Sequence, residues 1–255
     1  MFNKSSLTVM AMFAGLAFTV QAEMLYQFKF ETKDGKTSLS NSGKAGGNAK
    51  VVEFAGKGVD FVNDAPVKGL TACNFILQKS RQRAGRLELD NSEKVLRCDK
   101  VGDKITFMTW VKWRGFDRPS GIAATCPDGQ KSGWGIRIMP DGKLSFAAFG
   151  GFGHRSSKQI VPKDKWTHIA FSWNVGNSKG LKFYINGKDA GINLSYIGDK
   201  PTPGNSNKIR IGVQTPRFYL PLNGMIYDLR IYNEVLAPEK IAAIAAEVKL
   251  DNGKK

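Results

Sequence analysis

The feature that most constrains the fold is a series of short apolar stretches with alternating polarity, separated by tight-turn sequences. The clearest stretches are residues 25–30, 105–107, 144–148 and 181–185. The turn sequences are Asp34-Gly35, Pro140-Asp141-Gly142, Asn186-Gly187, Pro203-Gly204-Asn205 and Asn223-Gly224. Alternation indicates strands because successive side chains point to opposite faces, and Asn-Gly or Asp-Gly favours hairpins because type I′ turns need two positive φ angles. The pattern predicts one all-β antiparallel sandwich or barrel rather than an α/β fold.

Only the C-terminal end has helical periodicity. Apolar residues at helical spacing follow Pro238, and proline suits the first turn of a helix. We expect a short helix over residues 238–248 and a polar tail over residues 249–255. Residues 32–50 are rich in Gly, Ser, Asn and Lys, so we expect a loop or weakly ordered strands there.

Residues 1–22 have the features of a secretory signal peptide. Lys4 precedes an acid-free apolar stretch over residues 7–20, and small residues stand at the −3 and −1 positions of a cleavage site after Ala22. The apolar stretch is shorter than the ~20 residues of a membrane-spanning helix; a retained membrane anchor is the alternative. We expect an exported protein, periplasmic, at the cell surface or extracellular, with one domain over residues 23–248 and no transmembrane segment after cleavage.

Three cysteines, Cys73, Cys98 and Cys126, suit an exported protein with one disulfide. Cys73 and Cys98 flank a charged stretch, and we expect them to pair and to leave Cys126 buried. The alternative is that all three are small apolar residues of the core. The absence of a CxxC pair excludes a zinc module with four cysteine ligands, and only 2 His argue against a histidine-rich metal site.

Six sequence blocks occur in an order and spacing that are specific as a set. They are residues 105–113, 132–146, 165–173, 181–188, 209–212 and 222–236. Together they resemble the laminin-G-like, concanavalin-A-like jelly-roll family of secreted bacterial proteins, over roughly residues 85–247. The resemblance implies an antiparallel jelly-roll β-sandwich with a short C-terminal helix.

The loop over residues 39–48 resembles the Asp-Ser-Gly-Asn-Gly loop of that family, with Asn41 at a position where an acid is usual. The sequence assigns no cofactor to the chain. A structural calcium ion in this loop is the one metal that the resemblance suggests. The departure at Asn41 from the usual acid argues against calcium there.

Glu88, Asp90 and Glu93 resemble in spacing the carboxylates of jelly-roll glycanases, in which two glutamates act as nucleophile and general acid with an aspartate between them. Here Asp90 begins an Asp-Asn-Ser turn sequence. We therefore expect these side chains at a solvated hairpin tip rather than in a catalytic cleft.

A polysaccharide lyase on the same sandwich would need a tyrosine or histidine base. We expect His168 to be a satisfied core residue of a strand and His154 to lie in a loop, and no Gln-x-His strand accompanies either one. We expect no enzyme; a glycan-cleaving enzyme, glycoside hydrolase or polysaccharide lyase, is the alternative.

The tryptophans divide by their setting. Trp110, Trp113, Trp166 and Trp173 fall on predicted strands, where aromatic residues usually pack in the core. Trp134, in a Gly-Trp-Gly sequence, is the tryptophan that we single out for contact with a ligand, with core packing as the alternative.

The net charge is more informative about function than the carboxylates, histidines or tryptophans. Lys and Arg number 38 against 22 Asp and Glu, and the net charge of +16 falls to +15 when Lys4 leaves with the signal peptide. Such an excess attracts polyanions, and no helix-turn-helix, zinc-finger or RNP sequence points to nucleic acid. The alternative is that the charge only solvates the surface.

We predict a secreted, non-catalytic carbohydrate-binding or adhesion module for an acidic polysaccharide or another anionic surface glycan. The candidate ligand-binding residues are cationic or aromatic and lie in predicted loops, where sandwiches carry most of their binding sites. They are Arg114, Arg118, His154, Arg155, Arg217 and Tyr219. A structural envelope protein with a protein partner is the remaining alternative.

Overall fold

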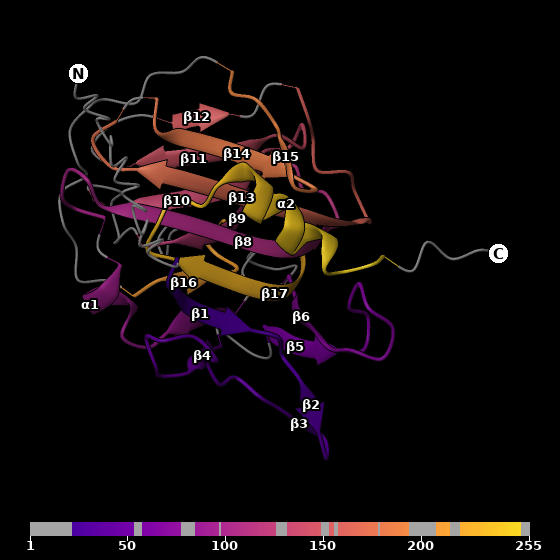
Figure 1. Cartoon of the computed structure of the whole chain (residues 1–255). Helices are drawn as coiled ribbons and strands as arrows, with labels where there is room; N and C mark the ends of the chain where they lie inside the picture. The colour runs from indigo at the N-terminus through magenta and orange to yellow at the C-terminus, as the bar shows by residue number, and fades with distance from the viewer. Residues whose placement is uncertain are drawn as a thin grey trace, which may run out of the picture.

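The computed structural model describes residues 22–53, 58–77, 85–96, 98–125, 132–148, 153–155, 158–177, 179–193, 208–214 and 220–250. Within these residues, two antiparallel sheets stack face to face (Figure 1). Of the predicted signal peptide only Ala22 is described, and the tail beyond Leu250 also lies outside the described residues. The sandwich confirms the predicted jelly-roll β-sandwich fold.

The first sheet has the strand order β15-β14-β13-β8-β17-β6-β5, and β1 pairs with the second half of β17. Its strands are β15 (Lys188–Asp189), β14 (Leu181–Ile185), β13 (Trp166–Asn174), β8 (Lys104–Trp113), β17 (Gly224–Tyr232), β6 (Ala72–Phe75), β5 (Val59–Val62) and β1 (Met24–Phe28).

The second sheet has the order β12-β11-β10-β9-β16-β7-β4. Its strands are β12 (Gly153–Arg155), β11 (Leu144–Ala148), β10 (Trp134–Ile138), β9 (Ser120–Ala124), β16 (Arg210–Ile211), β7 (Arg86–Leu89) and β4 (Ala49–Val52). A separate hairpin joins β2 (Thr32–Lys33) to β3 (Lys36–Thr37), and α1 (Ser92–Val95) is a single helical turn.

An aromatic core joins the two sheets. The rings of Phe107 and Phe171 on the first sheet stack at 5.7 Å, and Trp134 and Phe146 of the second sheet meet Phe171 at 5.4 and 5.2 Å. All four side chains are fully buried. Alternate residues of β8 and β13 therefore face the second sheet, and the residues between them face outward.

The predicted turns are confirmed where the chain folds back on itself directly. Asp34 and Gly35 have φ angles of 51° and 71°, and Asn186 and Gly187 have 50° and 75°, as type I′ hairpins require. Gly224 differs, because it begins β17 instead of turning the chain. A Cβ atom at Gly224 would lie 2.5 Å from the carbonyl oxygen of Lys112, so this glycine permits close strand pairing.

Helix α2 (Pro238–Ala246) packs on the outer face of the first sheet, where Ile241 and Ile244 are buried against Met108, Ala170 and other residues (Figure 1). It ends two residues before the predicted end at residue 248. Within the described ranges, neither helix has the length and apolar composition of a bilayer span.

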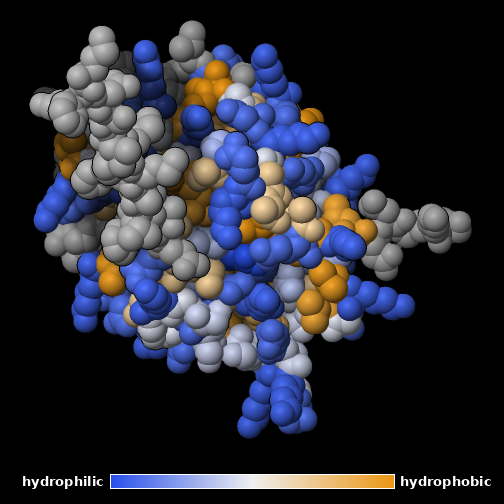
Figure 2. All heavy atoms as spheres, viewed as in Figure 1, coloured by the Kyte–Doolittle hydropathy of each residue, from blue (hydrophilic) through white to orange (hydrophobic). Residues whose placement is uncertain are grey.

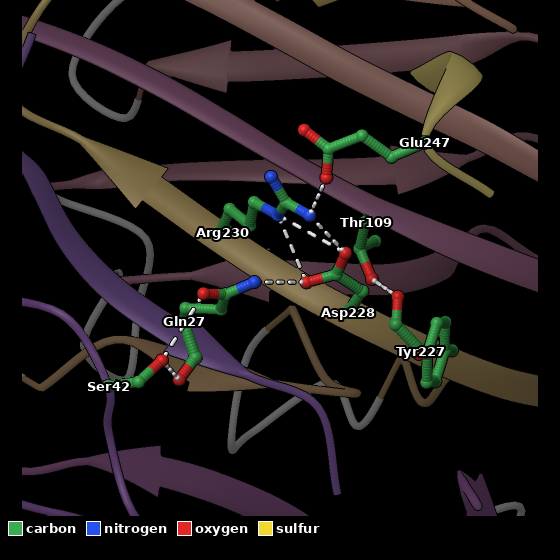
Figure 3. A network of polar contacts seen from close by, with 7 residues as sticks. All are labelled: Gln27, Ser42, Thr109, Tyr227, Asp228, Arg230 and Glu247. Carbon is green, nitrogen blue, oxygen red and sulfur yellow. Dashed lines mark hydrogen bonds and ion pairs between the residues drawn. The ribbon is translucent and has the colours of Figure 1, made fainter. Parts of the chain in front are cut away.

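A buried ion-pair network fastens the end of α2 to the sheet (Figure 3). The Arg230 guanidinium donates from Nη2 to Asp228 at 2.7 Å and to Glu247 at 2.6 Å, and Gln27 of β1 donates to Asp228 at 3.0 Å. Arg230 and Asp228 are buried, whereas the Glu247 side chain is 52% exposed. The network therefore fixes where the segment after α2 leaves the sheet.

Candidate ligand-binding cleft

A row of side chains crosses the outer face of the first sheet beyond α2. Paired residues of neighbouring strands form it: Trp166 with Lys112, Lys112 with Met225, Met225 with Asn74, and Asn74 with Asp60. Ala170 and Met108, which pack with α2, share the same alternation on β13 and β8. The row thus lies on the face that α2 covers farther along the strands.

The loop between β5 and β6 passes over this row. The Asp64 carboxylate accepts two hydrogen bonds from Nζ of Lys112, at 2.9 and 3.2 Å, and the Asp64 carbonyl oxygen accepts one from the Trp166 indole at 3.1 Å. β5 is the edge strand of the sheet, so the loop reaches across β17 and β8 to make these contacts. Its backbone fixes the orientation of the partly exposed Trp166 ring.

A cleft of about 510 Å³ opens beside Trp166, within the size range of small-molecule sites. Its lining residues come from the β5–β6 loop, the segment before β13, the β14–β15 turn and the end of the described chain. They are Asp64, Ala65, Pro66, Lys68, Pro162, Lys165, Trp166, Thr167, Asn186 and Leu250. An aromatic ring, two prolines and two lysines thus meet in one concavity.

Cations dominate the rim of this cleft. Lys68 and Lys165 line the cleft, are exposed and have no carboxylate partner within the described ranges. Lys112 differs because its charge is balanced by Asp64. On the face shown in Figure 2, hydrophilic side chains predominate and apolar ones form small groups. An anionic group in the cleft would meet unpaired positive charge.

A larger hollow of about 730 Å³ lies at the opposite end of β8. Its lysines, Lys94, Lys100 and Lys104, alternate with Asp99, Asp103 and Glu234, and no aromatic side chain lines it. The Asp103 carboxylate already accepts the backbone N–H groups of Asp99 and Lys100, at 3.1 and 3.0 Å. We therefore place the candidate site at the Trp166 cleft, where charge is unbalanced and an aromatic ring is present.

The six predicted ligand-binding residues do not come together in the described part of the chain. Arg114 lies near the row, where its guanidinium donates to Asn74 at 2.7 Å, and Arg118 is exposed on the β8–β9 loop. Arg217 and Tyr219 lie outside the described residues.

The prediction that His154 and Arg155 lie in a loop is wrong, because they belong to β12 at the edge of the second sheet. In the pairing of β12 with β11, His154 lies opposite Phe146 and Arg155 lies opposite Ser145. Edge pairing with β11 outweighs the glycine-rich sequence around them. The cleft lies on the first sheet, so these two residues belong to a different face of the molecule.

Two tryptophan assignments are reversed. Trp134, singled out for ligand contact, is fully buried and stacks on Phe146 at 6.4 Å, so its role is core packing. Trp166, assigned to the core, is partly exposed in the cleft. Its place at the start of a strand, directly after Pro162, Lys163 and Lys165, is the sequence signal that could have identified it.

His168 lies behind Trp166 on the same face of β13. It is buried, as predicted, and its ring meets Trp110 edge-on at 5.5 Å. Its Nδ1 has no hydrogen-bond partner in the described structure, so the expectation of a satisfied histidine is wrong. Burial lowers its pKa to about 4, which keeps the imidazole neutral at physiological pH.

The three carboxylates with glycanase-like spacing lie at a strand-turn-helix junction of the second sheet, not at the predicted hairpin tip. Glu88 is paired with Arg86 at 2.8 Å, and Asp90 with Lys208 at 2.9 Å. The hydrogen bond from Lys208 lowers the pKa of Asp90. Two of the three carboxylates are thus already ion-paired with cations, which does not match a pair that flanks a glycosidic bond.

The predicted disulfide does not join Cys73 to Cys98, and the two residues are buried in different surroundings. Cys73 lies on β6 between Phe61 of β5 and Ile226 of β17, whereas the Cys98 thiol interacts with Trp134 of the second sheet. Burial raises the pKa of both thiols. Cys126 lies outside the described residues.

Solved structures share this fold. Domain 4 of AbnA, a GH43 extracellular arabinanase from Geobacillus stearothermophilus solved in complex with arabinotriose, is 19% identical, with a TM-score of 0.61 over 88% of this chain and 98% of that chain. The binding domain of Paraclostridial Mosquitocidal Protein 1 is 14% identical, with a TM-score of 0.62 over 88% of this chain and 52% of that one.

Botulinum neurotoxin type C, whose cell entry depends on interaction with two ganglioside molecules, matches at 15% identity and a TM-score of 0.57, over 89% of this chain and 51% of that one. The chain thus spans about half the length of these toxin structures. No curated protein matches the sequence. The family model of the concanavalin A-like lectin/glucanases superfamily matches residues 88–242, more than half of the chain, and the chain therefore belongs to that superfamily.

Proposed function

We propose that this chain is an exported, non-catalytic carbohydrate-binding module that holds an acidic glycan in the cleft beside Trp166. The observation that carries the proposal is the partly exposed indole, whose N–H is held by the Asp64 carbonyl oxygen at 3.1 Å. Because this polar group is already bonded, the ring offers apolar surface of the kind that packs against a sugar ring.

The lysines at the rim supply the preference for acidic sugars. Lys68 and Lys165 line the cleft, and an ammonium group on a flexible stem attracts carboxylate or sulfate as a point charge. A glycan that carries an acidic group near the stacked sugar ring would satisfy both features. The net charge of the chain favours the same ligands by raising the rate of encounter with polyanions.

The structural relatives support a sugar ligand. The arabinanase domain was solved with arabinotriose, and the neurotoxin requires gangliosides for cell entry. Two of the three carboxylates of the glycanase-like pattern, Glu88 and Asp90, are ion-paired on the other sheet, which favours binding over cleavage.

The test is retention on an array of neutral and acidic polysaccharides at low and moderate salt, with release of reducing ends and of unsaturated ends measured on each. We expect retention on uronic-acid or sulfated polysaccharides that weakens as salt rises, without either product. Depolymerisation would contradict the non-catalytic function, and retention on neutral polysaccharides alone would contradict the acidic preference.

Two double variants locate the site. Lys68→Gln with Lys165→Gln removes two charges at the cleft, and Lys33→Gln with Lys36→Gln removes two exposed charges from the β2–β3 hairpin. The first pair should reduce retention about tenfold or more, and the second pair should leave it within about twofold. Equal losses in both would mean that net charge alone, and not the cleft, retains the glycan.

A further inference from the structure

The loop over residues 41–47 holds the outer edge of β1. Three backbone N–H groups of the loop donate to three carbonyl oxygens of β1 at 3.0–3.1 Å: Ser42 to Gln27, Lys44 to Met24 and Ala45 to Leu25. The other edge of β1 pairs with β17. The loop thus takes the place of a further strand, and its conformation decides whether the first sheet is closed at this edge.

The Asn41 side chain lies between this loop and the strand. Its Oδ1 accepts hydrogen bonds from the backbone N–H of Gln27 at 2.9 Å and of Gly43 at 2.8 Å. Its Nδ2 donates to the carbonyl oxygens of Leu25 at 3.0 Å and of Gly46 at 3.2 Å. Two donors and two acceptors therefore meet at one side chain. Only an amide satisfies all four, because a carboxylate has no hydrogen to donate.

The loop backbone is closely packed around these contacts. A Cβ atom at Gly43 would lie 2.4 Å from the carbonyl oxygen of Leu25, so the loop backbone is pressed against β1. Gly46 and Gly47 have φ angles of 63° and 74°, which return the chain toward β4. The four bonds of Asn41 are thus made within a closely packed turn rather than by a mobile side chain.

A calcium ion does not fit this set of donors. Calcium takes about six to eight oxygen ligands, with carboxylates prominent among them. The carbonyl oxygens of Leu25 and Gly46 instead receive the amide hydrogens of Asn41, and no cluster of three His, Cys, Asp or Glu exists among the described residues. The loop that the family resemblance offered for calcium is organised around an amide group.

We propose that the Asn41 amide takes the place of a metal ion, so that this loop closes on β1 without calcium, and that Asn41→Asp alone would turn the loop into a site for a hard divalent cation. An aspartate would keep the bonds from Gln27 and Gly43 through one oxygen. Its second oxygen would face the carbonyl oxygens of Leu25 and Gly46. Three oxygens would then converge without a hydrogen between them, and a cation bound there would complete its coordination with water.

The experiment measures thermal unfolding of the purified protein with millimolar calcium and with chelator, together with calorimetric titration of calcium chloride. The wild-type melting temperature should be the same in both conditions, and no heat of binding should appear. Asn41→Asp should melt lower than wild type in chelator and recover in calcium. Asn48→Asp is the matched control, because it adds the same charge at an exposed position of the same segment and should show no calcium response.

Saturable stabilisation of the wild type by calcium, or a heat of binding, would overturn the proposal. So would an Asn41→Asp protein that is as stable as wild type in chelator, or one that is less stable and indifferent to calcium. If the variant does not fold in chelator, its folding on addition of calcium supports the proposal and its failure to fold in calcium contradicts it. None of these readouts involves a glycan, so the result is independent of the proposed function.

Discussion

Trp134 and Trp166 differ clearly in burial, and we assign them different roles. Trp134 is enclosed by Phe146 and Phe171 between the sheets, whereas Trp166 lies at the surface of one sheet. Trp134→Ala should reduce the free energy of unfolding by about 3–5 kcal/mol, because it leaves a large cavity in the core. Trp166→Ala should cost much less. Urea unfolding of the two variants measures the difference, and equal losses would contradict the assignment of Trp166 to the cleft.

His168 should make stability depend on pH. The unfolded chain protonates an imidazole near pH 6.5, whereas burial delays protonation in the folded protein to about pH 4. The unfolded state therefore binds more protons between these values. The contribution of His168 to the free energy of unfolding is fully present above about pH 6.5. It is lost as the pH is lowered toward 4, which reduces stability by up to about 3 kcal/mol.

The variant that isolates this effect is His168→Phe, which keeps a ring against Trp110 and cannot take up a proton. Asp228, Arg230 and Glu247 act on the imidazole and are unchanged in the variant. The loss of stability between about pH 7 and pH 4.5, measured by urea unfolding, should be smaller in the variant than in the wild type. An identical loss in both proteins would show that other groups cause the acid sensitivity.

At the scale of elements, the Asp228–Arg230–Glu247 network should decide how firmly α2 is held. Arg230→Ala leaves the buried Asp228 carboxylate without its partner, and we expect a loss of about 3–5 kcal/mol. Glu247→Gln should cost less than about 1 kcal/mol, because that side chain is half exposed. Chemical unfolding tests the ranking. Adding Asp228→Asn to Arg230→Ala should restore part of the loss, and no recovery would contradict a role for the unpaired charge.

The hairpins and the Trp166 cleft differ in how far local sequence can predict them. Asn186-Gly187 and Asp34-Gly35 determine their hairpins because the required positive φ angles are a local property. The exposure of Trp166 is not local, since it depends on α2 stopping short of this row and on a loop that crosses from the far edge of the sheet. The environment of Cys73 likewise depends on which strands flank β6. Strand identity could be predicted from alternation, whereas the cleft could not.

At the scale of the whole molecule, the sandwich places different properties at its ends. The cleft with its unpaired lysines lies where β8 ends and β13 begins, and the larger hollow with balanced charges lies where β8 begins. If binding rests on the rim lysines, affinity for an acidic glycan should fall steadily as ionic strength rises through the range where the Debye length is about 10 Å. Titration at several salt concentrations measures this slope. The Lys68→Gln, Lys165→Gln protein should have a shallower slope than the wild type, and an unchanged slope would place the contacts elsewhere.

The central claim is that the Trp166 cleft binds the glycan, and the most direct test is the affinity of one acidic oligosaccharide for the wild type and for Trp166→Ala. The oligosaccharide is taken from the best-retained polysaccharide of the array, and Ile160→Ala serves as a control at another exposed apolar side chain. We predict that Trp166→Ala weakens binding at least about tenfold, which is about 1.4 kcal/mol, while Ile160→Ala leaves it unchanged. An unaltered affinity in a folded Trp166→Ala protein would contradict the account.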